Sequence, residues 1–177
     1  MKRVRRAIGR ETTTERLGLP ELVTVPYVDL RRYMGHWFEI ARYPHRFEKG
    51  AVAASATYTL RPDGQIDVVN AAHQGSRDGP VKETRGRARV ADPQTNAKLE
   101  VRFIPFVWQP YWIIDLAPDM SYSVVGHPSR DYLWVLSRTP RMDPTTYQGI
   151  LDRISAQGYP LEPLELTAQP LATDTLH

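Results

Sequence analysis

The sequence contains no cysteine. This absence excludes disulfides, thiolate metal sites, cysteine nucleophiles and a lipid-modified cysteine within these 177 residues. Long apolar runs are also missing, because none approaches the roughly 20 residues that a membrane-spanning helix needs. The basic run MKRVRR is followed by AIGRETTTERLG, which lacks the apolar stretch of a secretory signal. The chain as given is therefore expected in the cytoplasm, unless its true start lies upstream.

A strong excess of charge of one sign is also absent, since the formal net charge is only +3 and the basic residues are scattered. The N-terminal run MKRVRR is interpreted as a solvated tail, with an arm for nucleic acid or a membrane surface as the alternative. The sequence has no phosphate loop, no Gly-X-Ser-X-Gly elbow and no HExxH signature. We therefore predict no cofactor, no metal site, no catalytic residue and no nucleic-acid partner.

What the sequence does contain is a series of short alternating runs, separated by turn signals such as Pro-Asp-Gly. This pattern is typical of a meandering antiparallel sheet. The eight predicted strands cover residues 36–42, 51–60, 66–72, 81–90, 98–103, 111–117, 122–127 and 132–138. Eight strands can close into a barrel around one small ligand or form a two-sheet sandwich.

The inward faces of these strands favour the barrel. Arg85, Arg87 and Arg89 alternate with small residues, so the arginines face water and the small residues face inward. Small residues are interleaved with aromatic ones and with Asn70 on the inward faces, whereas a dry sandwich core would prefer uniform aliphatic residues. The sequence therefore predicts an all-β, up-and-down barrel with a lined cavity.

A single helix is predicted after the strands, at about residues 143–157. Asp143 is its N-cap and Pro144 its first residue, and Gly158 ends it. Its apolar stripe, at helical spacing, is expected to pack outside the barrel. The domain is predicted to span residues 26–170, with a possible short ninth strand in 161–169. Residues 1–25 are interpreted as a flexible basic lead and 171–177 as a tail.

Gly35 and Trp37 open the first strand, and Arg138 ends the eighth. In a closed barrel these two ends are neighbours, so the guanidinium can lie over the indole at the barrel floor. Gly35 would let the incoming chain pass close beneath the ring. We predict that Gly35, Trp37 and Arg138 form a structural floor.

These residues also carry a resemblance. The segments GHWFEIAR, FEKG, ATYTL and DYLWVLSR, together with Gly35-X-Trp37 and Arg138, resemble the signature regions of the lipocalin family. The similarity is to its bacterial lipocalin and apolipoprotein D branch and spans about residues 26–170. It implies a calyx that binds and transports or stores a small hydrophobic ligand, a fatty acid or a lysophospholipid, without enzymatic activity. A lipocalin-like enzyme, such as an isomerase, is the alternative.

Bacterial members of that branch are typically exported, many as outer-membrane lipoproteins. The resemblance therefore implies an outer-membrane or periplasmic location. The chain as given has neither the signal nor the lipidated cysteine of those members, so the resemblance does not decide the location. Strand parity, with the sixth strand resolved by the resemblance, gives the predicted ligand-binding residues. They are Glu39, Ala54, Ala56, Tyr58, Asn70, Val101, Phe103, Tyr111, Ile113, Val125, Tyr132 and Trp134.

The role of Glu39 and the position of the ligand head group stay open at this point. Glu39 shares the parity of Trp37 and points inward, either as a core carboxylate bonded to Tyr58, Asn70 or water, or as a selector of the ligand head group. No strand is expected to present an inward Arg or Lys. An anionic head group is therefore expected at the mouth, near the following cations: Arg42, Arg46, Lys49, Arg77 and Arg130.

The segment 104–110, IPFVWQP, is unusually apolar for a rim. It is interpreted as a mouth loop containing Phe106 and Trp108, and serves as a lid, a membrane-dipping or partner-binding tip, or a dimer contact. The protein is accordingly expected to be a monomer or a homodimer.

Overall fold

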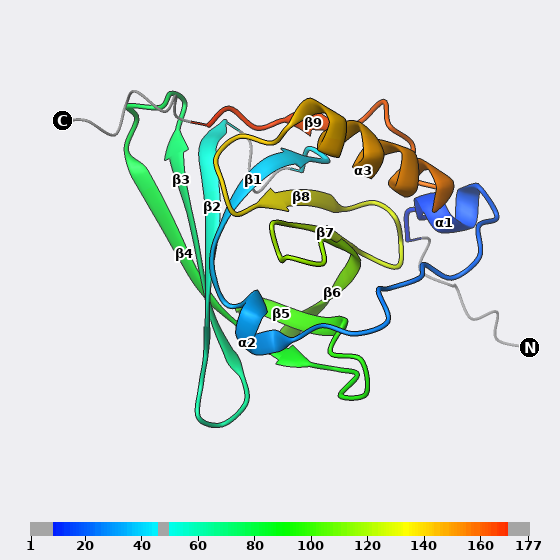
Figure 1. Ribbon diagram of the computed structural model, residues 1–177, viewed down its shortest axis with the longest axis horizontal. Helices are drawn as coiled ribbons and strands as arrows, with labels where there is room; N and C mark the ends of the chain where they lie inside the picture. The colour runs from blue at the N-terminus through cyan, green and yellow to red at the C-terminus, as the bar shows by residue number, and fades with distance from the viewer. Residues whose placement is uncertain (1–8, 46–49, 170–177) are drawn as a thin grey trace, which may run out of the picture.

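The computed structural model describes residues 9–45 and 50–169, and its centre is a closed antiparallel barrel (Figure 1). The strands follow one another around the barrel in chain order, and β1 pairs with both β8 and β2, which closes the wall. The predicted eight-stranded up-and-down barrel is confirmed, and the sandwich is excluded. The eight strands are β1 (Gly35–Arg42), β2 (Ala51–Leu60), β3 (Ile66–Gln74), β4 (Val81–Val90), β5 (Lys98–Ile104), β6 (Val107–Leu116), β7 (Tyr122–Gly126) and β8 (Leu133–Ser137).

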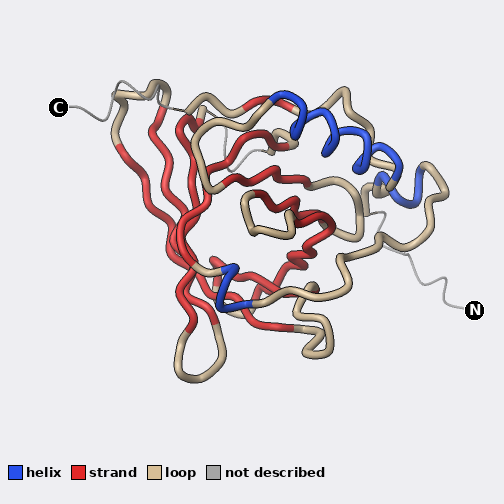
Figure 2. The backbone as a smooth tube through the Cα atoms, in the orientation of Figure 1, coloured by secondary structure: helices blue, strands red, loops and turns tan. Residues whose placement is uncertain are grey.

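The helix α3 (Pro144–Ala156) lies on the outside of the barrel, along β1 and β8 (Figure 2). Asp143 caps it by accepting a hydrogen bond from the Thr146 amide. Ile150 and Ile154 are fully buried, in a cluster that also contains Val135 of β8. A short strand, β9 (Glu165–Leu166), then pairs with Ala41 and Arg42 at the end of β1. The predicted helix and the possible ninth strand are therefore both present, while residues 170–177 lie outside the described part.

Residues 9–25 differ from the free lead that the sequence predicted. Helix α1 (Thr13–Arg16) has a capping box at Thr12, and the amide of Thr14 donates to the Ser129 carbonyl at 3.0 Å. Leu22 is only 2 % exposed, within the cluster beneath α3. The described part of the segment therefore packs along the barrel wall, with Leu22 buried in the outer apolar cluster. Residues 1–8 lie outside the described part.

The barrel has two separate apolar clusters. One fills the inside of the barrel near its closed end, and the other lies between the outer wall and α3. The short helix α2 (Leu30–Tyr33) crosses the closed end just before β1, so that Tyr33 points inside and belongs to the inner cluster. The barrel is therefore solid at this end.

Strand β1 contains an irregularity that controls the parity of its second half. Its register with β8 shifts between Glu39 and Ala41, so one extra residue is inserted at Ile40. A bulge of this kind reverses which residues face inward beyond it. Ile40 and Ala41 both join the outer cluster, whereas Arg42 pairs with Trp134 of the inner wall.

Candidate functional site

The closed end of the barrel is sealed by Trp37, which is 0 % exposed. The guanidinium carbon of Arg138 lies 3.7 Å from the centroid of its ring, and the indole N–H donates to the Tyr33 carbonyl at 2.9 Å. Gly35 has φ +98°, and a Cβ there would lie 3.4 Å from Arg138 Nη1. The structure therefore has the cation–π contact expected from the sequence, with the chain passing beside it in a backbone conformation that favours glycine.

Above the floor, four hydroxyl groups form a connected chain inside the barrel. The Tyr33 hydroxyl lies 2.9 Å from Ser123 Oγ and 2.8 Å from the Tyr111 hydroxyl, which in turn lies 2.9 Å from the Tyr58 hydroxyl. Burial raises the pKa of Tyr33 to about 12 and raises the pKa of Tyr58 and Tyr111 as well, so all three stay neutral. Tyr58 and Tyr111 were predicted, but Tyr33 and Ser123 were not assigned to the site; the i, i+4 spacing of Tyr33 and Trp37 was the available signal.

The inward side chains change from buried to accessible along the barrel axis. Toward the floor, Ile66 and Val68 of β3 and Leu99 of β5 are at most 2 % exposed. Nearer the mouth, Asn70, Val101 and Trp134 also face inward but are only half-buried. An inward side chain that solvent can still reach lies beside a lumen rather than in a packed core. The inner wall is therefore packed at the floor and accessible to solvent toward the mouth.

The predicted lining residues divide along the same axis. Tyr111 and Ile113 belong to the inner cluster and Trp112 to the outer one, so the ambiguity of the sixth strand is resolved as expected. Glu39, Ala54, Ala56, Tyr58, Ile113 and Val125 are buried; Asn70, Val101, Tyr111 and Trp134 are half-buried; Phe103 and Tyr132 are exposed.

Glu39 is buried inside the barrel, at 5 % exposure, but its partners differ from those predicted. Its carboxylate accepts hydrogen bonds from Arg42 Nη1 at 2.6 Å and from the Thr167 hydroxyl at 2.6 Å. The bulge at Ile40 turns Arg42 inward, and this arginine is 9 % exposed. The expectation that no strand presents an inward Arg or Lys is therefore wrong, and the inside of the barrel contains a buried ion pair.

The C-terminal segment supplies the other side of this pair. The Thr167 amide donates to the Ile40 carbonyl of β1, and the carbonyl of Ala168 accepts from the Ala53 amide of β2. Gln169 Nε2 then donates to the carbonyls of Glu39 and Ala54, at 2.7 and 2.8 Å. The segment therefore fills the gap between β1 and β2 at the mouth, where these strands no longer pair with each other.

Aromatic rings surround the mouth. Tyr132 and Trp134 are nearly parallel, with centroids 6.2 Å apart, and His45 meets both of them edge-on. His127 packs against Tyr132 from the other side, and burial lowers the pKa of this histidine. The rim on this side therefore presents flat aromatic surfaces to an apolar ligand.

The cations expected at the mouth differ in their location and exposure. Arg77 is exposed on the loop between β3 and β4, as expected. Arg130 was expected at the mouth as a solvated cation, and this expectation is wrong. The residue is 2 % exposed and donates hydrogen bonds to the Gln157 carbonyl at the end of α3 and to the Thr14 hydroxyl. It satisfies the carbonyl of Gln157, the residue that caps the C-terminus of α3, and this partner is consistent with its burial. Arg46 and Lys49 lie outside the described residues.

The segment 104–110 is the tip of a hairpin rather than a loop. Ile104 and Val107 pair directly, so only Pro105 and Phe106 form the turn. Phe106 is 91 % exposed and has φ +65°, a conformation that a bulky side chain rarely adopts. The tip does not cover the mouth as a lid.

Trp108 does not belong to the tip either. It lies on the outer face of β6, with the guanidinium carbons of Arg89 and Arg102 at 3.9 and 4.9 Å from its ring centroid. The two residues that the sequence grouped together are therefore separate features. Phe106 is exposed at the tip, whereas Trp108, two residues further along β6, is half-buried beside two arginines.

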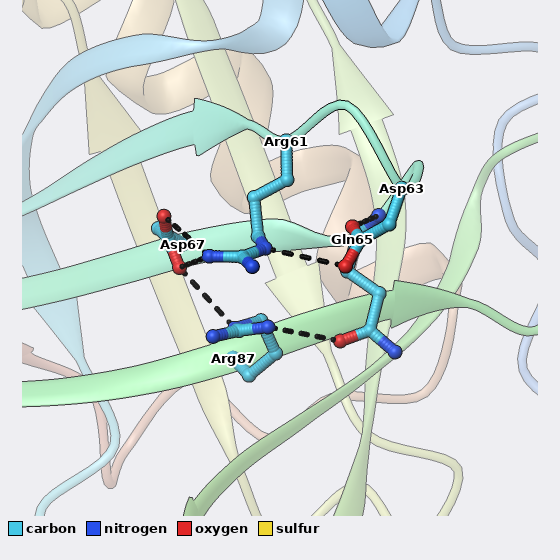
Figure 3. Close-up of polar contacts among 5 residues, drawn as sticks. All are labelled: Arg61, Asp63, Gln65, Asp67 and Arg87. Carbon is cyan, nitrogen blue, oxygen red and sulfur yellow. Dashed lines mark hydrogen bonds and ion pairs between the residues drawn. The ribbon is translucent and has the colours of Figure 1, made fainter.

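A hollow of about 680 Å³ lies on the outside of the barrel, where β4 parts from β5. Gly86 is at the crossing, and a Cβ there would lie 2.4 Å from the Arg102 carbonyl oxygen, so only glycine fits. One border is a polar cluster in which Asp67 pairs with Arg61 and Arg87 (Figure 3). Its mainly outward-facing, charged lining distinguishes this hollow from the lumen.

Within the described ranges, 9–45 and 50–169, the structure contains no group of three His, Cys, Asp or Glu side chains placed to hold a metal ion. Nor does any helix of these ranges have the length and apolar character needed to cross a bilayer. The site to be explained is the lumen between the tyrosine layer and the mouth.

Comparisons with known proteins give the same architecture. The family model described as "Lipocalin-like domain" matches residues 28–169. Temperature-induced lipocalin-1 of Arabidopsis thaliana is 40% identical over 158 residues, which cover 84% of this chain and 83% of that protein. Outer membrane lipoprotein Blc of Escherichia coli K12 is 37% identical, with 80% of each chain covered, and mouse apolipoprotein D is 34% identical, with 84% and 80% covered.

Among solved structures, insecticyanin of the tobacco hornworm Manduca sexta superposes with a TM-score of 0.69 over 87% of each chain, at 18% identity. Apocrustacyanin C2 gives a TM-score of 0.65 at 13% identity, with 83% of this chain and 84% of that chain covered. At these identities the structural likeness concerns the fold alone.

Proposed function

The chain belongs to the lipocalin family, whose members bind small hydrophobic ligands, and we propose that this protein binds and carries a fatty acid or a lysophospholipid in its barrel. The observation that supports this most is the gradient of burial along the inner wall, which is packed at the floor and accessible above the tyrosines. A chain of methylenes can lie in such a lumen without disturbing the core.

The apolar wall favours a long alkyl chain. Val101 and Trp134 line the accessible part, and each methylene removed from water contributes about 0.8 kcal/mol. Even after the free energy lost in ordering the chain, this is enough for micromolar binding. The ligand is held mainly by burial, which suits a carrier that must also release it.

The charges favour a head group that stays at the mouth. Arg42, inside the barrel, is matched by Glu39 and gives no net charge to attract an anion inward. Arg77 is exposed at the open end, beside solvent. A carboxylate or phosphate is therefore solvated at the rim while its chain enters the lumen, and its contribution to affinity is small.

The hairpin tip supports loading at a lipid surface. Phe103, Ile104, Phe106 and Val107 form an exposed apolar group at the same end as the mouth, since β5 and β6 turn there. Trp108 follows on the outer wall with its two arginines, an order that resembles the aromatic and basic layer of proteins at a membrane interface. We propose that this tip contacts the bilayer while ligand passes between membrane and lumen.

A titration distinguishes a carrier from an enzyme. Fatty acid or lysophospholipid added to lipid-free protein should change Trp134 fluorescence in a saturable way, and the recovered ligand should be chemically unchanged. Conversion of the recovered lipid would instead support the lipocalin-like enzyme, and an unchanged signal at all lipid concentrations would contradict the proposed ligand class. Trp134→Phe, which keeps an apolar ring at the same place, shows whether the signal arises from the lumen.

A further inference from the structure

The tyrosine layer contains more hydroxyl protons than its own hydrogen bonds consume. Three hydrogen bonds connect Ser123, Tyr33, Tyr111 and Tyr58 in that order. Each bond uses one proton, and each of the four hydroxyls carries one. Among the described residues no further side-chain or backbone partner of these oxygens is present, so one O–H proton stays available.

The burial of the four groups decides where this proton is. Ser123 is 0 % and Tyr33 2 % exposed, so a donor left unused at that end would be costly. Tyr58 forms the other end, and Tyr111 beside it is the most accessible of the four residues. The available donor is therefore provided by Tyr58 or Tyr111, at the bottom of the lumen.

The surroundings of this donor favour a neutral acceptor. Ile113, Leu99 and Val125 around it are apolar and buried, and the carboxylate of Glu39 lies near enough to raise the pKa of Tyr58 further. A buried anion at this depth would lose its hydration and lie near that carboxylate. A hydroxyl, ether, ketone or ester oxygen meets no such opposition.

We infer that the Tyr58–Tyr111 end of the hydroxyl chain is a second, deep polar subsite, which accepts one neutral oxygen at the far end of a lipid chain. This inference rests on the proposed function and specifies which class of lipid the protein prefers. The preferred ligand is an oxygenated lipid, with an anionic or zwitterionic head group at the mouth and a neutral oxygen at the depth of the tyrosines. A plain alkyl chain of the same length leaves the donor unpaired.

The unmodified protein provides the first test. Calorimetric titrations compare saturated fatty acids with acids of the same number of heavy atoms that carry a terminal hydroxyl or a terminal methoxy group. Because the protein supplies the proton, the methoxy acid should bind as well as the hydroxy acid. At one chain length, both should bind about ten-fold more tightly than expected from the shorter and longer members of their series.

Two tyrosine variants provide the second test. In Tyr58→Phe, Tyr111→Phe the rings remain but both donors are removed, so the affinity advantage of the oxygenated acids over plain acids of equal size should disappear. Tyr147→Phe on α3, outside the barrel, is the matched control and should keep the advantage. Thermal unfolding of each variant shows whether the fold is retained.

The outcomes separate the two proposals. If no acid of any kind binds, the proposed function fails and the subsite with it. If plain acids bind but the oxygenated series shows no preferred length in the unmodified protein, the subsite is absent and the carrier function stands. Persistence of the preference in a folded double variant would equally overturn the role of these hydroxyls.

Discussion

Arg138 connects three backbone segments while lying 3.7 Å above the ring of Trp37. Its Nη1 donates to the His36 carbonyl, its Nη2 to the Arg32 carbonyl and its Nε to the Met120 carbonyl. A single side chain therefore joins the start of β1, the end of α2 and the turn before β7. The floor is a structural unit, separate from the lumen above it.

We predict that Trp37→Ala and Arg138→Ala both destabilise the fold. Loss of a packed Trp costs about 3–5 kcal/mol, and loss of a partly buried cation–π contact about 1 kcal/mol. Arg138→Lys keeps the charge but not the planar fork that reaches three carbonyls, and should recover only part of the stability. Denaturant unfolding measures each loss, with exposed Arg141→Ala as the control. Unchanged unfolding midpoints for the first two variants would show that Trp37 and Arg138 do not stabilise the fold.

The buried pair of Glu39 and Arg42 should show strong coupling. Arg42→Met leaves a carboxylate buried without its cation, and Glu39→Gln leaves the opposite charge, so each change should cost about 3–5 kcal/mol. The double variant should lose clearly less than the sum of the single variants. A double-mutant cycle by urea unfolding measures this difference. Purely additive losses would show that the 2.6 Å contact contributes no stability.

Alkaline pH should destabilise the protein through the tyrosine layer. The folded pKa of Tyr33, about 12, lies above its ordinary value of 10, so the folded state holds this proton more tightly than the unfolded state. Stability is then complete below pH 10 and decreases as the pH rises toward 12. Unfolding free energies measured across this range should decrease less steeply in Tyr33→Phe than in the unmodified protein. Tyr27→Phe, at a position 60 % exposed, serves as the comparison, and equal slopes in all three proteins would contradict the prediction.

The hairpin tip should affect lipid transfer without supporting the fold. Phe106→Asn removes the exposed ring and suits the left-handed backbone at φ +65°, so stability should stay the same or rise by about 1 kcal/mol. Transfer of a fluorescent fatty acid from vesicles should nevertheless become several-fold slower. Val23→Asn, on an exposed apolar residue of the N-terminal segment, should leave the rate unchanged. Equal effects of the two variants would remove the tip from the loading step.

The sequence was sufficient for features that depend on local periodicity and on the closure of the barrel. Alternation located the strands, spacing located α3, and closure brought Trp37 and Arg138 together. The orientation of Arg42 could not be predicted, because it depends on one inserted residue at Ile40 that no local pattern indicates. The burial of Arg130 was missed for a related reason, since its partners at Gln157 and Thr14 are distant in the chain.

The tyrosine layer shows the same limit inside the site. Parity placed Tyr58 on an inward face, and the family resemblance did the same for Tyr111. Tyr33 comes from a helix that precedes the barrel, so strand alternation says nothing about it. Thr167 and Gln169 reach the lumen from the opposite end of the chain. Polar partners provided by segments outside the regular strands are the part of this site that required the structure.

The most direct test of the account is the dependence of affinity on chain length. Lipid-free protein is titrated calorimetrically with unsubstituted saturated fatty acids of increasing length, at low and at moderate salt. Burial in an apolar lumen predicts that each added methylene tightens binding, by at most about 0.8 kcal/mol, until the lumen is full, and that salt changes the affinity only weakly. If short acids bind as tightly as long ones, or if moderate salt abolishes binding, the ligand is held by its head group and the lumen is not the binding site.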